Sequence, residues 1–193
     1  MKIGVLAIQG AVSEHINMLK RAEAEAFAVK TVENINSVDG LILPGGESTT
    51  IGRLIRLYKI DAAIKERAAK GMPIYGTCAG MILLSRHING FNQPTLELID
   101  TAITRNAFGR QVDSMEVDLA IKGFDTPFHA TFIRAPVAKD LGKDVEILSE
   151  LSEGAVFVKQ GNILASSFHP ELGNDLRIHK YFLDMVKSFL NKQ

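Results

Sequence analysis

The chain of 193 residues alternates short, almost fully apolar runs with longer segments whose apolar residues recur at helical spacing. The first run, Lys2–Ile8, is nearly continuous in apolar residues, which predicts a strand buried on both faces. A helix is expected at Ser13–Ala24, followed by strands at Phe27–Val32 and Asp39–Leu43. This order with short links predicts an α/β fold with an open, mostly parallel sheet flanked by helices. The expected stripe of the first helix is Ile16, Leu19 and, at its edge, Lys20.

The pattern changes after the middle of the chain. Helices are predicted at Ile51–Tyr58, Asp61–Lys70 and Ala79–Arg86. Short β-like runs with turn signals between them then predict an antiparallel β extension of the parallel sheet. These runs are Leu96–Ile103, Val112–Ile121, Phe128–Arg134, Val145–Leu151, Ala155–Gln160 and Ile163–Phe168. A closing amphipathic helix is expected at Leu176–Leu190, with Leu176, Tyr181, Phe182, Met185 and Phe189 as its packing face.

Composition narrows the class of protein. Hydrophobic residues make up 46% of the chain and charged residues 23%, and the formal net charge is zero, which gives no electrostatic case for nucleic acid or a membrane surface. No linker or repeat divides the sequence, so residues 1–193 are expected to form a single domain. The single cysteine excludes an intramolecular disulfide and a multi-cysteine metal site. A cytoplasmic protein without a metal or a bound cofactor is the default expectation.

The segment Gly76-Thr77-Cys78-Ala79-Gly80 joins a short buried strand to an apolar helix. It is the thiol counterpart of the Gly-x-Ser-x-Gly nucleophile elbow. The glycines allow strand and helix to pack closely, and the amino end of a helix favours a thiolate, which is the nucleophilic form. A buried, inert cysteine is the alternative. Cys78 is therefore the candidate nucleophile.

A second candidate element is Pro44-Gly45-Gly46-Glu47-Ser48-Thr49-Thr50, which follows the third strand. Loops at the carboxyl ends of parallel strands form the ligand crevice of such sheets, so this loop is expected on the same side as Cys78. Ser48 or Thr49 is expected to cap the following helix as well. The loop lacks the Gly-Lys-Ser/Thr ending of a phosphate loop.

The third element is His169-Pro170-Glu171, where a β run stops. If the segment stays extended through Pro170, His169 and Glu171 share one side, because extended chains repeat every two residues. A carboxylate beside an imidazole orients it and stabilises the imidazolium. The other histidines are assigned surface or core roles: His15, His87, His129 and His179.

Cys78, His169 and Glu171 thus form a possible thiol–imidazole–carboxylate triad for acyl transfer through a thioester. The amide of Ala79 and a glycine amide of the Gly45-Gly46 pair, assigned to Gly46, are the expected oxyanion donors. From the residues alone, the reaction stays open among amidase, peptidase, esterase and thiol acyltransferase.

These motifs resemble the class I (triad) glutamine amidotransferases and, among them, the PdxT/Sno family of glutaminase subunits of pyridoxal 5′-phosphate synthase. The matching segments run in order over nearly the whole chain: Gly4–Gly10, Pro44–Thr49, Gly76–Leu84, Arg105–Gln111, Phe132–Pro136 and Phe168–Leu172. Met81 follows the second elbow glycine, where many class I relatives have glutamine and PdxT-type sequences tend to be apolar. The fold implied by the resemblance is flavodoxin-like, of the class I glutamine amidotransferase type.

The resemblance implies hydrolysis of L-glutamine to L-glutamate and ammonia, which would pass to a PdxS-type synthase subunit in a hetero-oligomer for vitamin B6 biosynthesis. It makes Cys78 the nucleophile, His169 the general base and acid, and Glu171 its orienting group. Gln9 and Gly10 would lie near the active site and the synthase contact, so that docking could orient the oxyanion peptide. The implied glutamine pocket consists of Gly45, Gly46, Glu47, Arg105, Ile133 and Arg134.

Three alternatives remain open. The chain could be a cysteine peptidase or a DJ-1-like hydrolase, although these are not expected to combine the Pro-Gly-Gly-Glu loop with His-Pro-Glu. It could be a glutaminase that serves a synthase for anthranilate or imidazole glycerol phosphate, against which the Arg105–Gln111 segment argues by resemblance. It could also be a non-catalytic binding subunit, which an intact Cys78, His169 and Glu171 set disfavours.

Overall fold

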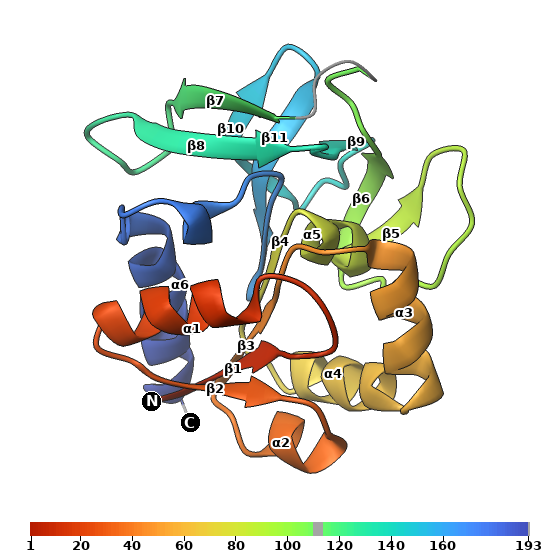
Figure 1. The fold of residues 1–193 in the computed structure, drawn as a ribbon, viewed down its shortest axis with the longest axis vertical. Coiled ribbons are helices and arrows are strands. Elements are labelled where there is room, and N and C mark those ends of the chain that lie inside the picture. The colour runs from red at the N-terminus through yellow and green to blue at the C-terminus, as the bar shows by residue number, and fades with distance from the viewer. Residues whose placement is uncertain (110–113, 193) are drawn as a thin grey trace.

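The computed structural model describes residues 1–109 and 114–192, and it places a central sheet between two layers of helices (Figure 1). The helices are α1 (Val12–Arg21), α2 (Val32–Asn36), α3 (Ser48–Leu57), α4 (Ile60–Ala69), α5 (Ala79–Leu84), α6 (Arg177–Leu190) and the 3₁₀ turn η1 (Pro170–Leu172). The strands are β1 (Lys2–Leu6), β2 (Glu25–Val29), β3 (Gly40–Leu43), β4 (Ile74–Thr77), β5 (Ser85–Ile88), β6 (Ile99–Thr104), β7 (Ser114–Leu119), β8 (Phe128–Ile133), β9 (Val137–Lys139), β10 (Glu146–Leu151), β11 (Gly154–Gln160) and β12 (Ile163–Ser166).

The parallel part of the sheet has the strand order β2-β1-β3-β4-β12. This is the flavodoxin-like order 2-1-3-4-5. In such sheets ligands bind at the point where the strand order reverses, which is the crevice between the carboxyl ends of β1 and β3. The loops after β1 and β3 are the Gln9-Gly10 and Pro44–Thr50 segments. The topology therefore places both segments at the same edge of the sheet.

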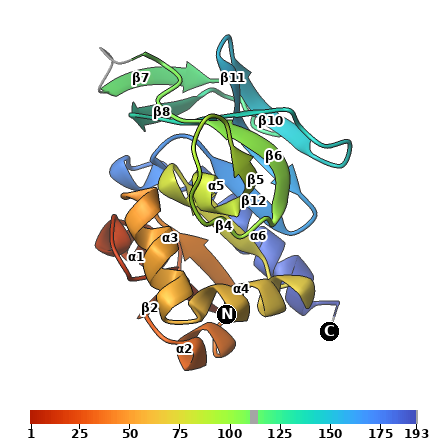
Figure 2. The same cartoon turned by 90° about the vertical axis from the view of Figure 1, so that its right-hand side faces the viewer.

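An antiparallel part continues the same sheet through β12-β11-β9-β6, with β10 pairing to β11 and β5 running parallel to β6 at the far edge. Strands β7 and β8 form a separate antiparallel pair over this part, and Figure 2 shows this β-rich region stacked above the helical region. The expected mostly parallel α/β sheet with an antiparallel extension is confirmed.

Two apolar clusters hold the layers together. One packs α2, α3, α4 and α5 against one face of the sheet, and the other packs α1, α6 and the β7–β8 pair against the opposite face. Consecutive residues of β3 alternate between them, since Leu41 and Leu43 belong to the first cluster and Ile42 to the second. Both faces of β1, β3, β4 and β12 are thus buried, as continuous apolar runs predict, whereas the edge strand β2 is largely exposed or half-buried.

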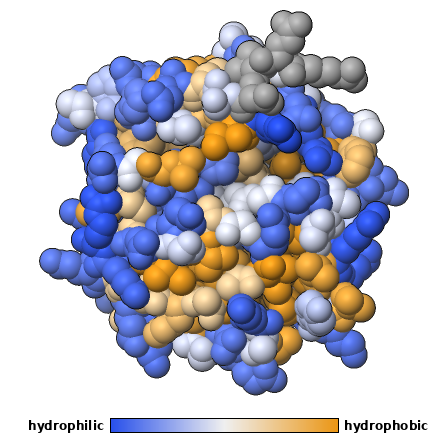
Figure 3. Space-filling view, in the orientation of Figure 1, coloured by the Kyte–Doolittle hydropathy of each residue, from blue (hydrophilic) through white to orange (hydrophobic). Residues whose placement is uncertain are grey.

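The outer surface mixes polar and apolar residues. In the view of Figure 3, apolar residues gather over the lower half of the molecule, and charged and polar residues surround them. Among the described residues, no helix is long and apolar enough to cross a membrane.

Several element boundaries differ from the sequence prediction. The second strand is Glu25–Val29 rather than Phe27–Val32, because the side chain of Thr31 accepts a hydrogen bond from the Asn34 amide and starts the unpredicted helix α2. The helix after the elbow ends at Leu84 rather than Arg86, and strand β5 begins at Ser85. Strand β9 was also not predicted. Residues 110–113 lie outside the described residues, and they include the end of the expected Arg105–Gln111 segment and the start of the expected strand Val112–Ile121.

The predicted packing faces of two helices were shifted. In α1 the buried residues are His15, Met18 and Leu19, so that of the expected stripe Leu19 is buried, Ile16 is half-buried and Lys20 is exposed. In α6 they are Ile178, His179, Phe182, Leu183 and Val186, so that only Phe182 of the expected face is fully buried. Both true faces contain a buried histidine, which a hydrophobic count assigns to solvent.

Candidate active site

A cleft of about 680 Å³ opens at the carboxyl edge of the parallel strands. Cys78 and His169 lie in it, and its walls come from the loop after β3, the start of α5, the end of β6 and the end of β8. The lining residues are Gly46, Glu47, Ser48, Cys78, Ala79, Ile82, Arg105, Asn106, Ser114, Ile133, Arg134 and His169. The site therefore brings together most of the residues that sequence motifs single out.

Cys78 forms the predicted strand-to-helix elbow between β4 and α5. Its φ of 48° lies in the left-handed region, and its amide donates to the Ser166 carbonyl oxygen at 2.8 Å, which anchors it to β12. A Cβ on Gly80 would lie 2.0 Å from the Leu43 carbonyl oxygen, and one on Gly76 would lie 2.5 Å from the Gly80 carbonyl carbon. Only glycine allows the helix to approach the strands this closely.

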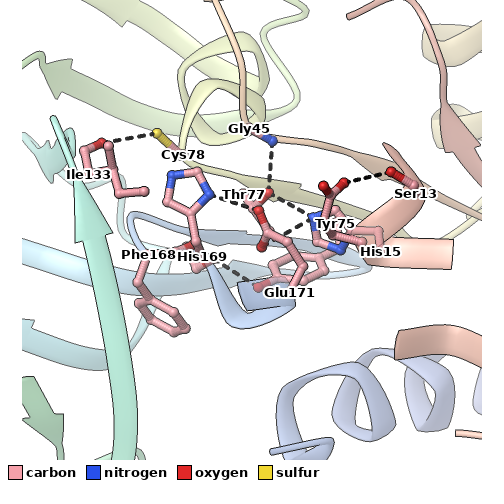
Figure 4. A network of polar contacts seen from close by, with 12 residues as sticks. Ser13, His15, Gly45, Tyr75, Thr77, Cys78, Ile133, Phe168, His169 and Glu171 are labelled. Carbon is pink, nitrogen blue, oxygen red and sulfur yellow. Dashed lines mark hydrogen bonds and ion pairs between the residues drawn. The ribbon is translucent and has the colours of Figure 1, made fainter. Parts of the chain in front are cut away.

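The residue Cys78 is 9% exposed, and its thiol donates to the carbonyl oxygen of Ile133, with 3.8 Å between sulfur and oxygen. His169 lies between Cys78 and Glu171 (Figure 4). Its Nδ1 is 2.7 Å from Oε1 of Glu171, and its backbone amide donates to the Thr131 carbonyl oxygen at 2.8 Å. These three side chains have the spatial order that a thiol–imidazole–carboxylate triad requires.

The expected extended shape at Pro170 was wrong, although the predicted contact is present. Pro170, Glu171 and Leu172 form a 3₁₀ turn, because Pro170 at its first position has no amide hydrogen to lose and a φ suited to a helical start. The turn folds the Glu171 side chain back onto the imidazole of His169. The motif thus positions its acid by a tight turn and not by the two-residue repeat of a strand.

The charges of the triad follow from the contacts of its members, which outweigh the effect of burial. Burial alone would lower the pKa of His169, but the Cys78 sulfur and the Glu171 carboxylate raise it to about 10. Burial alone would raise the pKa of the Glu171 carboxyl, yet His15 and His169 lower it below its ordinary value. The environment therefore favours an imidazolium beside an ionised carboxylate.

The Pro44–Thr50 loop and the Gln9-Gly10 loop are hydrogen-bonded to each other. The Ala11 amide donates to the Gly45 carbonyl oxygen at 3.1 Å, and the Glu47 amide donates to Oε1 of Gln9 at 2.7 Å. The Gly45 amide donates to Oγ1 of Thr77 at 3.0 Å. The amides on both sides of Gly46 are therefore engaged within the protein, and Gly46 itself lines the cleft.

Glu47 has a structural task in addition to lining the cleft. Its carboxylate accepts hydrogen bonds from the amides of Thr49 and Thr50, at 3.0 and 2.7 Å, and so caps helix α3. These bonds outweigh its partial burial and lower its pKa to about 2. The expected cap by Ser48 or Thr49 was wrong, because the hydroxyls of both residues donate to Oε1 of Gln93 instead.

The two arginines and the isoleucine of the expected pocket also line the cleft. The Arg105 guanidinium lies 4.6 Å from the centre of the Phe91 ring, which holds the half-buried side chain in place. Ile133 presents its carbonyl to the thiol, and Arg134 has a φ of 44° directly after it. All six residues of the expected glutamine pocket lie around Cys78, and five of them line the cleft directly; Gly45 lies behind, where a Cβ added to it would be 3.5 Å from the Cβ of Cys78.

His15 and His179 were assigned surface or core roles, and the structure places both in the core next to the triad. Nε2 of His15 lies 3.4 Å from Oε2 of Glu171 and 3.1 Å from Oγ1 of Thr77. Its Nδ1 lies 3.1 Å from Nε2 of His179. The signal that sequence reasoning missed is the spacing of His15 with Met18, Leu19 and Ala22 on one helical face.

No cluster of three or more His, Cys, Asp or Glu side chains suited to a metal ion occurs in residues 1–109 and 114–192.

The comparisons with known proteins agree on one family. The model of the SNO glutamine amidotransferase family matches residues 5–188. The chain is 52% identical to pyridoxal 5′-phosphate synthase subunit PdxT of Kosmotoga olearia, covering 100% of both chains, and 52% identical to that of Shouchella clausii, covering 96% of this chain and 95% of the other. A crystal structure titled glutamine amidotransferase superposes with a TM-score of 0.92 at 48% identity, covering 96% of this chain and 98% of that one.

Proposed function

Since the chain belongs to the SNO glutamine amidotransferase family, we propose that residues 1–193 act as one glutaminase domain, which hydrolyses L-glutamine to L-glutamate and ammonia for pyridoxal 5′-phosphate synthesis. The observation on which this rests is the Cys78–His169–Glu171 arrangement at the edge of a 680 Å³ cleft. The chemistry of such a set is attack on a carboxamide carbon by a thiolate.

In the proposed reaction, Nε2 of His169 holds the proton of the Cys78 thiol, and the thiolate attacks the side-chain carboxamide carbon of glutamine. The negative charge on the carboxamide oxygen is stabilised by the amides of Ala79 and Gly46. His169 returns the proton to the departing nitrogen, which leaves as ammonia, and a thioester remains on Cys78. His169 then takes a proton from water, which attacks the thioester and releases glutamate.

Substrate recognition is assigned to the cleft walls. An arginine suits the α-carboxylate of glutamine because the guanidinium offers a planar set of donors, and Arg105 and Arg134 line the same cleft as Gly46 and Glu47. Glu47 suits the α-ammonium group, because its carboxylate stays ionised while it caps helix α3. The pocket thus offers opposite charges to the two ends of an amino acid.

The partner in this proposal is a PdxS-type synthase subunit in a hetero-oligomer, in the cytoplasm, and Gln9 and Gly10 belong to the contact. Two hydrogen bonds link that segment to the oxyanion loop, from Ala11 to Gly45 and from Glu47 to Gln9. In a trans peptide the carbonyl and the next N–H point in opposite directions, so the bond on the Gly45 oxygen also orients the Gly46 N–H. Docking at Gln9-Gly10 can thereby set the oxyanion donor, and the isolated subunit is expected to be nearly idle.

The test is glutamate release from L-glutamine by the wild type and Cys78→Ala, each with and without a PdxS-type subunit. We expect activity that increases strongly with the partner and decreases at least a thousandfold in Cys78→Ala. Activity that needs Cys78 but is indifferent to the partner would keep the glutaminase and reject the partner and its activating role. Absence of activity in every combination would reject the glutaminase.

A further inference from the structure

Within the triad, only one of the two carboxylate oxygens of Glu171 has a partner. Its Oε1 faces His169 at 2.7 Å, whereas its Oε2 is fully buried and, among the described residues, has no partner that meets standard hydrogen-bond geometry. A buried carboxylate oxygen without a donor is costly, because nothing replaces its lost hydration. The polar group that the structure brings to this oxygen is Nε2 of His15, at 3.4 Å (Figure 4).

The proton positions in this cluster follow from its contacts. If Nε2 of His15 were unprotonated, its lone pair would face the carboxylate, and Nδ1–H of His15 would have to donate to His179. That arrangement would leave an N–H on Nδ1 of His179, which is buried and has no partner among the described residues. The neutral arrangement without a buried, unpaired N–H therefore has the proton of His15 on Nε2 and that of His179 on Nε2, donating to Nδ1 of His15.

We propose that His15 is a positioning residue for the triad, whose Nε2–H is shared between Oε2 of Glu171 and Oγ1 of Thr77. This rests on the proposed glutaminase reaction, in which Glu171 must stay ionised and oriented toward His169. Thr77 also accepts the Gly45 amide at 3.0 Å, so the same histidine touches both the acid of the triad and the support of the oxyanion loop. The group that positions Glu171 is therefore the neutral Nε2–H donor of His15, which lies on the buried face of helix α1.

The groups around His15 are consistent with a neutral donor. The titratable side chains that face it are Glu171 and His169 from the 169–172 segment and His179 from α6, and Glu14 lies beside it on α1. Burial lowers the pKa of His15, against the attraction of Glu171, and burial lowers the pKa of His179 to about 3. Both rings are therefore neutral at pH 7.

The test compares His15→Gln, which keeps an N–H donor near the Nε2 position, with His15→Leu, which removes it at similar volume. His179→Leu is the matched control, because it removes a buried imidazole of the same cluster that makes no contact with Glu171. Without the donor, the Glu171 carboxyl binds a proton at higher pH, so the acid limb of kcat/KM for glutamine, measured with the PdxS-type subunit, should shift upward by about one pH unit. At pH 7 we expect kcat to be about tenfold lower in His15→Leu with KM little changed, and His15→Gln and His179→Leu to stay within about threefold of wild type.

A second readout needs neither substrate nor partner. Cys78 is the single cysteine of the chain, so its alkylation by iodoacetamide as a function of pH reports directly on the thiolate–imidazolium pair. In His15→Leu, the acid limb of the pH dependence of Cys78 labelling should shift upward, as the acid limb of kcat/KM does. This holds even if the chain proved to use a substrate other than glutamine. A failed glutaminase assay with this labelling shift would therefore reject the proposed function alone.

The inference is overturned if folded His15→Leu keeps the wild-type acid limbs of kcat/KM and of Cys78 labelling. It is also overturned if His179→Leu shifts these acid limbs as far as His15→Leu does. If His15→Leu does not fold, His15→Asn replaces it, because the shorter amide reaches the Nδ1 position toward His179 and not Glu171. If the acid limbs of the pH profiles are then equal in His15→Gln and His15→Asn, the positioning role is overturned. A shift confined to His15→Asn would support it.

Discussion

The contact between the Gln9-Gly10 loop and the oxyanion loop leaves no space for a side chain at position 10. Gly10 has a φ of +110°, far beyond the left-handed well near +57°, and a Cβ there would lie 1.8 Å from the Gly45 carbonyl oxygen. Gly10→Ala must therefore separate the two loops by roughly 1.6 Å to restore ordinary contact. The strained backbone costs about 1–3 kcal/mol and the overpacking about as much again, so we expect a loss of ~3 kcal/mol or more.

For a domain of this size each kcal/mol lowers Tm by about 2–4 °C, so Gly10→Ala should lower Tm by at least ~6 °C. The separation would also break the bond from the Ala11 amide to the Gly45 oxygen, at 3.1 Å, and so disorient the proposed oxyanion donor. Partner-stimulated glutamate release should fall at least tenfold, in kcat rather than in KM.

Gly161→Ala is the matched control for Gly10→Ala. Gly161 has a φ of +55°, inside the left-handed well, and no atom lies within 4 Å of its hypothetical Cβ. This variant should lose only the ~1 kcal/mol of a left-handed residue and keep its glutaminase activity. Calorimetry and the glutaminase assay on both variants decide the point: equal Tm losses, or full activity in Gly10→Ala, would refute the steric coupling of the two loops.

Three further outcomes are expected. Glu47→Gln should lose about 1 kcal/mol of stability at pH 7 as the cap of α3 weakens. Because the folded pKa of Glu47 is lowered to about 2, its contribution is present above pH 4.5 and lost as pH falls through 2, so the two unfolding curves should converge on acidification; a constant difference would contradict this. Thr77→Val should cost ~1–3 kcal/mol in urea unfolding, since the Gly45 amide then has no acceptor, and an unchanged midpoint would exclude that bond as a stabilising contact. His169→Asn should slow iodoacetamide labelling of Cys78 at pH 7 by at least tenfold, because the imidazolium that stabilises the thiolate is gone, and equal rates would disprove the ion pair.

The amino-acid sequence already determined the parallel sheet and the chemical elements of the site. Continuous apolar runs identify strands buried on both faces, and the Gly-x-Cys-x-Gly segment predicts the elbow, because only glycines at positions 76 and 80 permit that packing. The pairing of His169 with Glu171 also follows from local sequence, since only Pro170 lies between them and a single turn brings the two side chains together.

Tertiary structure decided what depends on contacts between distant segments. Glu47 became the cap of α3 because its carboxylate, and not the hydroxyls of Ser48 or Thr49, meets the first free amides. His15 was placed beside Glu171, far along the chain, by the packing of α1 and α6 on one face of the sheet. A hydrophobic pattern counts a histidine as polar and so sends it to solvent, whereas a buried carboxylate needs a donor, and only the folded chain shows which side chain supplies it.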